Sequence, residues 1–206
     1  MISLAHKTLF VHIPKCGGQS IEETFLKDFG LNWKNHRKLL LCMPKPVDWY
    51  GKSSALAHLA AQEYLDGHYL NQTAFESLYK FAVVRNPFKK MESHFTYGEY
   101  DQKYSFENFI VEVLPNLFKN NPFFRTQSEF IFGSAGKPLI DNIYKLENLS
   151  AHWPEIQEKS GLVSALTHKN STTKLITPLK WNPKMIEGLL SLYAKDFENF
   201  GYEVSA

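Results

Sequence analysis

The chain has 206 residues, of which 44% are hydrophobic and 21% charged, and 23 basic and 21 acidic side chains leave a formal net charge of +2. This length suits one substantial domain, and the composition is that of an ordinary globular protein. A charge so close to balance argues against wholesale binding of nucleic acid. No apolar run approaches the roughly 18 residues of a membrane span, so we expect no such span.

Two features bear on cellular location. The two cysteines, Cys16 and Cys42, are too few for a disulfide framework or a metal site, which suits a reducing compartment. The first ten residues contain few apolar side chains and lead directly into the first predicted strand, unlike a signal peptide. The sequence therefore predicts a cytoplasmic protein.

The stretch 9–29 predicts a strand, a glycine turn and a helix. Residues 9–13 are mostly apolar and indicate a buried strand, which Pro14 ends. A capping box over 20–23 predicts that the helix begins at Ser20. The expected buried face of this helix recurs every four residues, at Ile21, Phe25 and Phe29.

The turn between this strand and helix contains Lys15, Gly17 and Gly18. Backbone N–H groups of such a turn converge on one point, and the helix dipole and the lysine favour negative charge there. We therefore expect an anion site; the alternative is an ordinary turn in which the glycines only relieve strain. In nucleotide triphosphatases the lysine follows the glycines, whereas Lys15 precedes them.

The next elements place two further polar residues at strand ends. Region 32–52 is irregular and basic, and is either a solvated face or a rim for an anionic or saccharide acceptor. A short strand over 53–59 places His58 near its end, before a helix that begins around Ala60, at the edge where ligands gather in α/β sheets. Residues 78–84 form the second clear strand, and Arg85 follows it, either in an ion pair or as an anion clamp.

The remaining pattern completes an alternation of strands and helices. We expect helices from Phe88 to Tyr97, for whose first turn Pro87 is suited, from a Ser105 cap, from a Ser150 cap and from Asn182, a third strand over 141–147, and a polar loop over 167–174. This alternation predicts an α/β fold with a parallel sheet covered on both faces.

Two motifs carry a resemblance to a known family. His12-Ile-Pro-Lys-Cys-Gly-Gly-Gln-Ser20 resembles the 5′-phosphosulfate loop of the carbohydrate-type, family 2-like sulfotransferases. Phe81-Ala-Val-Val-Arg-Asn-Pro-Phe-Lys-Lys-Met-Glu-Ser93 is similar to their 3′-phosphate motif. Segments 127–130, 145–149 and 196–202 are also similar to parts of that family, so the likeness spans most of the chain.

The resemblance implies a single domain over 1–206 with a P-loop-like, three-layer fold, in which helices flank a central parallel sheet. It also implies the donor 3′-phosphoadenosine 5′-phosphosulfate (PAPS), with PAP as product and no metal required. Many relatives have threonine where this chain has Cys16 and Gln19. The implied donor-binding residues are Lys15, Cys16, Gly17, Gly18, Gln19 and Ser20 at the 5′ end, Arg85 and Ser93 at the 3′-phosphate, and Lys169 and Asn170 in a covering loop.

The implied reaction is transfer of a sulfuryl group to a hydroxyl acceptor, which we expect to be a carbohydrate or glycoconjugate. Lys15 would stabilise charge on the leaving oxygen, and a base must take the acceptor proton. His58 resembles the catalytic histidine of some family members; Glu63, Glu147, His12 and His94 are alternatives. Two other functions stay open: a nucleoside or sugar kinase with a degenerate loop, and a non-catalytic module that binds nucleotides or polysaccharides.

Overall fold

The structure is a computed structural model that describes residues 1–36, 58–167 and 179–205, and it confirms an α/β protein. The chain divides into two compact units. The first unit comprises Met1–Val84 and Glu129–Asn170, and the second comprises Arg85–Ser128 and Ser171–Ala206. We describe each unit separately.

The first unit contains a four-stranded sheet with the strand order β1-β2-β3-β4. Its strands are β1 (Ile2–Ser3), β2 (Thr8–Val11), β3 (Tyr79–Val84) and β4 (Asn142–Lys145). The last three strands are parallel, with Phe10 opposite Phe81 and Phe81 opposite Asn142. β1 pairs antiparallel with β2, so the expectation of a wholly parallel sheet is wrong at this edge. The reason is the connection, because residues 4–7 are too few for the crossover that parallel neighbours need.

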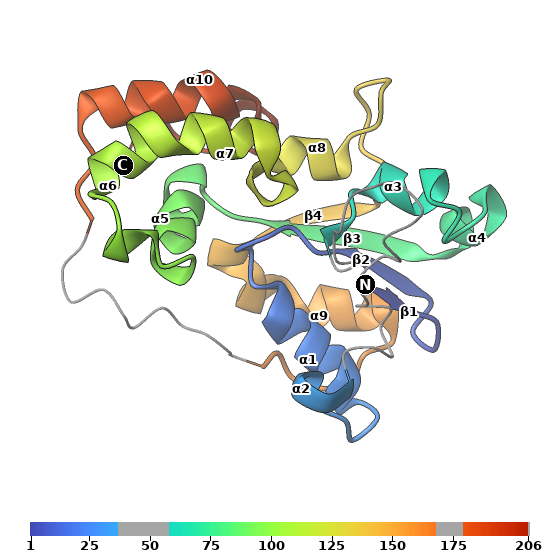
Figure 1. Cartoon of the computed structure of the whole chain (residues 1–206). Coiled ribbons are helices and arrows are strands. Elements are labelled where there is room, and N and C mark those ends of the chain that lie inside the picture. The colour runs from blue at the N-terminus through green and yellow to red at the C-terminus, as the bar shows by residue number, and fades with distance from the viewer. Residues whose placement is uncertain (37–57, 168–178, 206) are drawn as a thin grey trace. The chain divides into compact units, whose positions relative to one another are not determined.

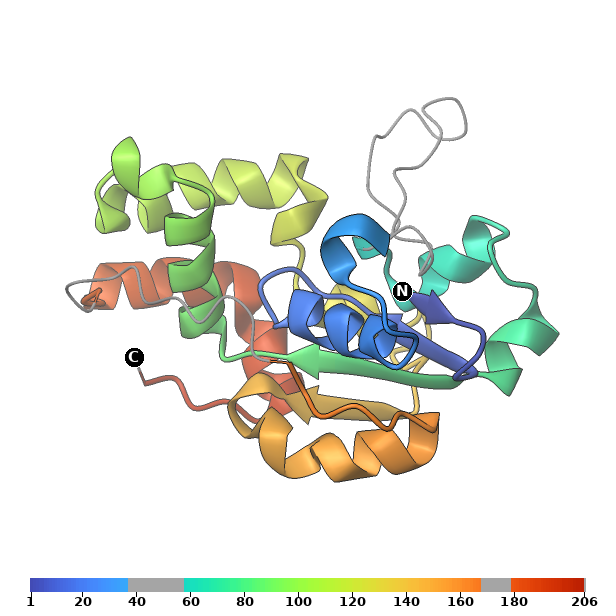
Figure 2. The same ribbon diagram turned by 90° about the horizontal axis from the view of Figure 1, so that it is seen from below.

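Helices cover both faces of this sheet (Figure 1). α1 (Gly18–Lys27) and α9 (Leu149–Ser160) lie on one face, which Figure 2 views from below, and α3 (Ala61–Asp66) lies on the other. α2 (Trp33–His36) follows α1, and α4 (Gln72–Ser77) precedes β3. The core beneath α1 and α9 is built from Phe10, Phe81, Val83 and Tyr144 of the strands and Ile21, Phe25, Leu26, Trp153 and Ile156 of the helices.

The second unit is helical. α5 (Pro87–Tyr97) begins at Pro87, one residue before the predicted start at Phe88, and α10 (Pro183–Phe200) follows the predicted Asn182 cap, whose side chain accepts the Met185 N–H at 3.0 Å. α6 (Phe106–Asn108) continues through a π-helical turn, Phe109–Val113, into α7 (Leu114–Asn120). α8 (Gln127–Ile131) begins in this unit, and its residues from Glu129 onward belong to the first unit. The core contains Phe88, Met91, Phe95, Phe109, Met185, Leu189, Tyr193 and Phe197. Across the described residues, no helix combines the length and the apolar character needed to cross a membrane.

Several predicted boundaries are wrong. α1 begins at Gly18 rather than Ser20, because Gly17 in a left-handed conformation starts the helix and no side chain caps it. Glu23, the expected capping-box partner, instead accepts the Trp33 N–H at 2.6 Å. α9 begins at Leu149, so Ser150 is not its cap, and β4 ends at Lys145, before Glu147. Residues 53–57 of the predicted strand over 53–59 and the loop residues 168–174 lie outside the described residues, and the described end of that strand, 58–59, is not a strand.

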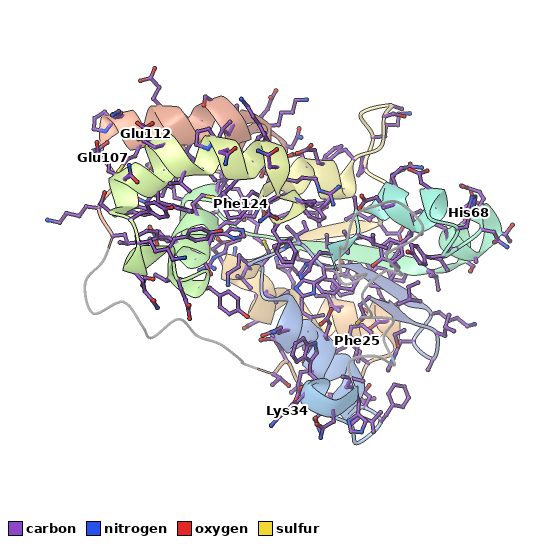
Figure 3. The ribbon with its side chains drawn as sticks, viewed as in Figure 1. Phe25, Lys34, His68, Glu107, Glu112 and Phe124 are labelled. Atoms are coloured by element: carbon purple, nitrogen blue, oxygen red, sulfur yellow. The ribbon has the colours of Figure 1, made fainter. Side chains whose placement is uncertain are left out.

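The end of α1 at Lys27 also changes the expected core. Phe25 is fully buried against the sheet and is labelled in Figure 3, whereas Phe29, two residues beyond the helix, is 50% exposed. The four-residue repeat that predicts a shared face holds only as far as the helix extends.

We expect Phe25→Ala to lower the free energy of unfolding by about 3–5 kcal/mol, because it leaves a cavity between α1 and the sheet. The matched variant Phe29→Ala removes the same side chain from a half-exposed site and should cost less than about 1 kcal/mol. Urea unfolding followed by circular dichroism measures both. Equal losses would show that Phe25 is not the anchor of α1.

Candidate functional site

The loop between β2 and α1 is tightly wound. β2 ends at Val11 and α1 begins at Gly18, and within the loop Lys15 and Gly17 both adopt positive φ angles, of 68° and 79°. A left-handed conformation is ordinary for glycine but costs a lysine roughly 1–3 kcal/mol, and such strain gathers at functional sites. The Cys16 side chain is buried, with its Sγ 3.5 Å from the Pro14 carbonyl oxygen. The loop therefore turns Cys16 inward, while Lys15 is half-buried.

The loop ends at the N-terminus of α1, where an anion would be stabilised. N–H groups in the first turn of a helix lack carbonyl partners within the helix, and the helix dipole places partial positive charge there. Gly18 and Gln19 are the first two residues of α1, and Ser20 is the third. With Lys15 three residues before the helix, the local chemistry is that of an anion cradle.

Gly18 is required by a neighbouring side chain. A Cβ atom at position 18 would lie 2.0 Å from both Cδ2 and Nε2 of His12. Such an overlap is impossible, so the His12 ring occupies the space that any other residue at 18 would need. At position 17, an added Cβ would lie 2.7 Å from Leu146 Cδ1, in addition to the positive φ. The structure thus gives both glycines a packing reason that holds without a ligand.

His12 is fixed by a buried carboxylate. Its Nδ1 lies 2.8 Å from Glu22 Oε1, and Glu22 Oε2 accepts the indole N–H of Trp33 at 2.5 Å. Burial raises the pKa of the Glu22 carboxyl, but the charge of His12 and the hydrogen bonds from His12 and Trp33 outweigh that effect and lower the pKa to about 2. Glu22 is therefore ionised at neutral pH, and the His12 nitrogen that faces it carries a proton.

His58, the predicted base, lies beside His12. Its ring centroid is 4.4 Å from that of His12, and its Nδ1 lies 3.0 Å from the His12 carbonyl oxygen. Because a carbonyl only accepts, Nδ1 is the protonated nitrogen, and Nε2 carries the lone pair of the neutral ring. Burial, and then the charge of His12, lowers the pKa of His58 to about 3. The ring is therefore neutral at pH 7, with its proton-accepting nitrogen fixed as Nε2.

The alternative bases are less well placed. Glu63 accepts the Ala60 N–H at 2.7 Å and so caps its own helix, α3. Glu147 is exposed beyond the end of β4. His94 belongs to the second unit, where its ring stacks on Phe124 at 4.4 Å. Of the predicted bases, the structure brings His58 and His12 next to the loop.

Arg85 is held by its backbone. Its N–H donates to Gln127 Oε1 and its carbonyl accepts from Gln127 Nε2, both at 2.8 Å. Gln127 is in turn fixed by Asp196, whose Oδ2 accepts the Gln127 N–H at 2.8 Å. Asp196 Oδ1 accepts both the N–H and the hydroxyl of Ser128, at 2.9 and 2.8 Å. This network belongs to the second unit. The two Gln127 hydrogen bonds engage the backbone of Arg85 and not its guanidinium.

The sequence analysis gave no role to Gln127 or Asp196, although both fall in segments that carry the family resemblance. Their signal is a buried polar side chain within an aromatic-rich stretch, which is visible only when burial is known. Ser93 is buried on α5, in the same unit as Arg85. Lys169 and Asn170 lie outside the described residues.

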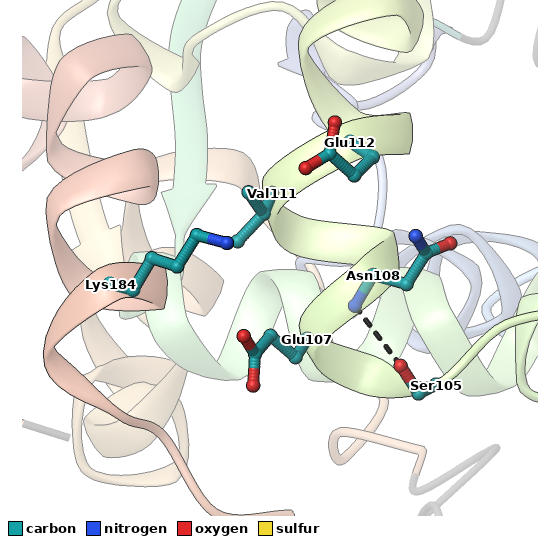
Figure 4. A pocket seen from close by; sticks show the side chains of 6 residues that line it. All are labelled: Ser105, Glu107, Asn108, Val111, Glu112 and Lys184. Atoms are coloured by element: carbon teal, nitrogen blue, oxygen red, sulfur yellow. Dashed lines mark hydrogen bonds between the residues drawn. The ribbon is translucent and has the colours of Figure 1, made fainter.

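A shallow pocket in the second unit lies among other residues (Figure 4). None of the predicted site residues lines it. Across residues 1–36, 58–167 and 179–205, no group of three or more His, Cys, Asp and Glu side chains is arranged to hold a metal ion. The pocket is lined by Ser105, Glu107, Asn108, Val111, Glu112 and Lys184.

Comparison with known proteins adds no assignment: no family model, no curated protein and no solved structure matches the chain. The site must therefore be judged on its own residues. The site consists of a loop in which Lys15 has a strained backbone, the N-terminus of α1 that follows it, and the neutral His58 beside His12.

We expect Gly18→Ala to destabilise the protein by about 1–3 kcal/mol, because the new methyl group forces the His12 ring aside. Gly188→Ala is the matched control, since it lies within α10 with nothing within 4 Å of the added Cβ. It should stabilise by up to about 1 kcal/mol through helix propensity. Thermal unfolding of both variants decides the matter, and unchanged stability of Gly18→Ala would remove the packing role of Gly18.

We also expect the His58 ring to stay neutral well below the ordinary histidine pKa of about 6.5. Since the pKa is lower in the folded state than in the unfolded state, the unfolded chain binds the extra proton, and stability falls as the pH drops from about 6.5 toward 3. Ring-proton NMR measures the titration. A midpoint near 6.5 in the folded protein would contradict the assigned burial.

Proposed function

We propose that this protein is a sulfotransferase that moves a sulfuryl group from PAPS to the hydroxyl of a saccharide or glycoconjugate. The observation that carries the proposal is the first unit's loop, in which Lys15 precedes the N-terminus of α1, and His12 contacts both Gly18 at the start of that helix and the neutral His58. The two motifs around Lys15 and Arg85 support the same assignment. The P-loop-like character of the fold is part of this proposal.

The 5′-phosphosulfate end is assigned to the loop. Backbone N–H donors do not depend on the side chain, so Cys16 and Gln19 in place of threonine leave the cradle intact. Lys15 neutralises the charge that develops on the 5′-phosphate as the sulfur–oxygen bond breaks. A sulfuryl group carries less negative charge than a terminal phosphoryl group, so a lysine and helix N–H groups supply the stabilisation for which kinases use Mg²⁺.

The 3′-phosphate is assigned to Arg85 and Ser93 of the second unit. A guanidinium donates two parallel hydrogen bonds to a phosphate, and the serine hydroxyl donates a third. The clamp of Gln127 on the Arg85 backbone supports this assignment, because a fixed backbone lowers the entropy lost when the side chain binds.

The acceptor proton is assigned to His58. In the transfer step the acceptor oxygen bonds to sulfur, its proton passes to His58 Nε2, and the bond from sulfur to the 5′-phosphate oxygen breaks to release PAP. A base with a pKa near 3 is weak, but a bound polyanion raises the pKa of a neighbouring imidazole. We therefore assign proton transfer to the donor-bound state.

The low pKa of His58 also favours a second candidate, a non-catalytic module that binds a nucleotide or a polyanion. In such a module the histidine is a buried structural group, and the loop and Arg85 bind without turnover. Release of PAP from PAPS in the presence of a panel of hydroxyl acceptors separates the two candidates.

In that assay we expect Lys15→Ala to lower kcat by about 100-fold or more, since it removes the charge that stabilises the leaving oxygen. Lys27→Ala, an exposed change at the other end of α1, is the control and should leave kcat unchanged. Arg85→Ala should weaken PAP binding by about 10–100-fold, the worth of lost hydrogen bonds to a charged group. Full turnover in Lys15→Ala would exclude the proposed mechanism, and unchanged PAP affinity in Arg85→Ala would make Arg85 structural.

A further inference from the structure

Three exposed apolar side chains of the first unit lie around one buried carboxylate. Val163 and Leu4 are 80% and 74% exposed, the two highest values among the large hydrophobic side chains of the described residues, and Phe29 is 50% exposed. Each lies on a connection: Leu4 between β1 and β2, Phe29 after α1, and Val163 after α9. Single exposed apolar residues are ordinary, but a group of them marks a contact surface.

The carboxylate of Asp28 brings these three connections together. Its Oδ2 lies 3.2 Å from His6 Nε2 and accepts the Val163 N–H at 2.9 Å. The His6 ring also packs edge-on against Phe29, with the ring centroids 5.2 Å apart. Leu4 is two residues before His6 in the turn between β1 and β2. We call Leu4, Phe29 and Val163 the Asp28 cluster.

The contacts of Asp28 hold the cluster in place at neutral pH. Burial raises the pKa of the Asp28 carboxyl, but hydrogen bonds from Ser164, Val163 and His6 outweigh that effect and lower the pKa. The carboxylate is therefore ionised, and its side chain is only 6% exposed. The apolar side chains stand on connections that are tied to one another, so they form a fixed part of the surface.

The exposed charges near the cluster are basic. Within residues 1–36 every exposed charged side chain is a lysine, because the carboxylates of that stretch are buried. Lys7 lies in the same turn as Leu4, and Lys27 is two residues before Phe29. A further lysine, Lys34 of α2, is labelled in Figure 3. The last turn of α9 leaves this balance unchanged, since it has one exposed carboxylate and one exposed lysine, which are Glu158 and Lys159.

A lipid surface fits these features better than a protein partner. The apolar side chains stand on three separate connections, so they offer no continuous helix or strand face for a protein to pack against. A bilayer interface needs no such face, because each apolar side chain enters the acyl boundary by itself. Lysines beside them keep their ammonium groups among the headgroups, and acidic headgroups attract them.

We propose that the Asp28 cluster is a membrane-docking surface: Leu4, Phe29 and Val163 enter the interface of an anionic bilayer, while Lys7 and Lys27 lie among its acidic headgroups. Attachment is peripheral and reversible, because three side chains bury far less apolar area than a membrane span or a pair of acyl chains. The proposal goes beyond the proposed function and does not rest on it, since no residue assigned to the donor or to the acceptor proton belongs to the cluster.

Sedimentation of the full chain with lipid vesicles tests the proposal. Vesicles of equal parts phosphatidylcholine and phosphatidylglycerol should bind the protein about tenfold or more tighter than vesicles of phosphatidylcholine alone, because only the former attract the lysines. Raising NaCl from about 0.1 M to about 1 M should remove most of that difference, since salt screens exposed charges.

Two variants with matched controls locate the surface. Leu4→Ser/Val163→Ser should weaken binding to the anionic vesicles by about tenfold or more, because it removes the apolar area that enters the bilayer. Val204→Ser changes an exposed apolar residue of the second unit and should bind as the wild type does. Lys7→Glu should weaken binding by about tenfold or more, whereas Lys137→Glu makes the same change of charge at an exposed lysine outside the cluster and should weaken it much less.

A wild-type chain that stays in solution with the anionic vesicles overturns the proposal. Equal losses in the double variant and in Val204→Ser, or in Lys7→Glu and Lys137→Glu, also overturn it. Circular dichroism checks that each variant is folded, which the exposure of the changed side chains leads us to expect.

Two further measurements separate this proposal from its alternatives. Self-association in analytical ultracentrifugation that the double variant abolishes, without vesicle binding, would make the cluster an interface between copies of the chain and would overturn the proposal. Affinity for PAP in solution should be equal in the double variant and the wild type. Loss of vesicle binding therefore leaves the proposed function intact, and vesicle binding without PAPS turnover would leave the docking surface in a protein of another function.

Discussion

The hydrogen bond between His12 and the buried carboxylate of Glu22 ties the end of β2 to α1, and the loop that contains Lys15 is closed by it. The other features of this region follow. The ring position that the bond sets excludes every residue but glycine at 18, and the His12 carbonyl fixes the orientation of His58. A buried ion that accepts hydrogen bonds from two separate elements is costly to disrupt, so the loop is held in its strained form by its surroundings rather than by its own sequence.

The second unit uses the same device at its own basic residue. Asp196, fully buried, accepts three hydrogen bonds from Gln127 and Ser128, and Gln127 in turn holds the backbone of Arg85. In both units a buried carboxylate orients a neighbour: Glu22 holds the His12 ring, whose carbonyl accepts from His58, and Asp196 holds Gln127, which clamps the backbone of Arg85. Such preorganisation fits recognition of a small polyanion, because the groups that bind it need little ordering when it arrives.

Local signals in the sequence were enough to find the strand, the glycine loop, Arg85 after β3 and the start of α5, since each depends on residues close together in the chain. Local signals failed where a residue's role depends on contacts with residues far away in the sequence. Asp196 and Gln127 are 69 positions apart, and Gln127 is 42 from Arg85, so no window along the chain relates them. In the sequence Glu22 looks like a residue on the polar face of a helix, and only the structure shows that it is buried. The antiparallel pairing of β1 depends on the short turn that precedes β2, and the exposure of Phe29 depends on the end of α1 at Lys27. Sequence propensity locates the ends of elements poorly.

The central claim is that the loop and Arg85 bind the two anionic ends of one adenine nucleotide. Thermal unfolding in the presence of PAP, 5′-AMP, and ATP with and without Mg²⁺ tests it most directly, because PAP and 5′-AMP differ only in the 3′-phosphate. The account predicts that PAP raises Tm without metal, that 5′-AMP does so much less, and that Arg85→Ala removes the difference. Equal shifts for PAP and 5′-AMP, or a shift seen only for ATP with Mg²⁺, would contradict it.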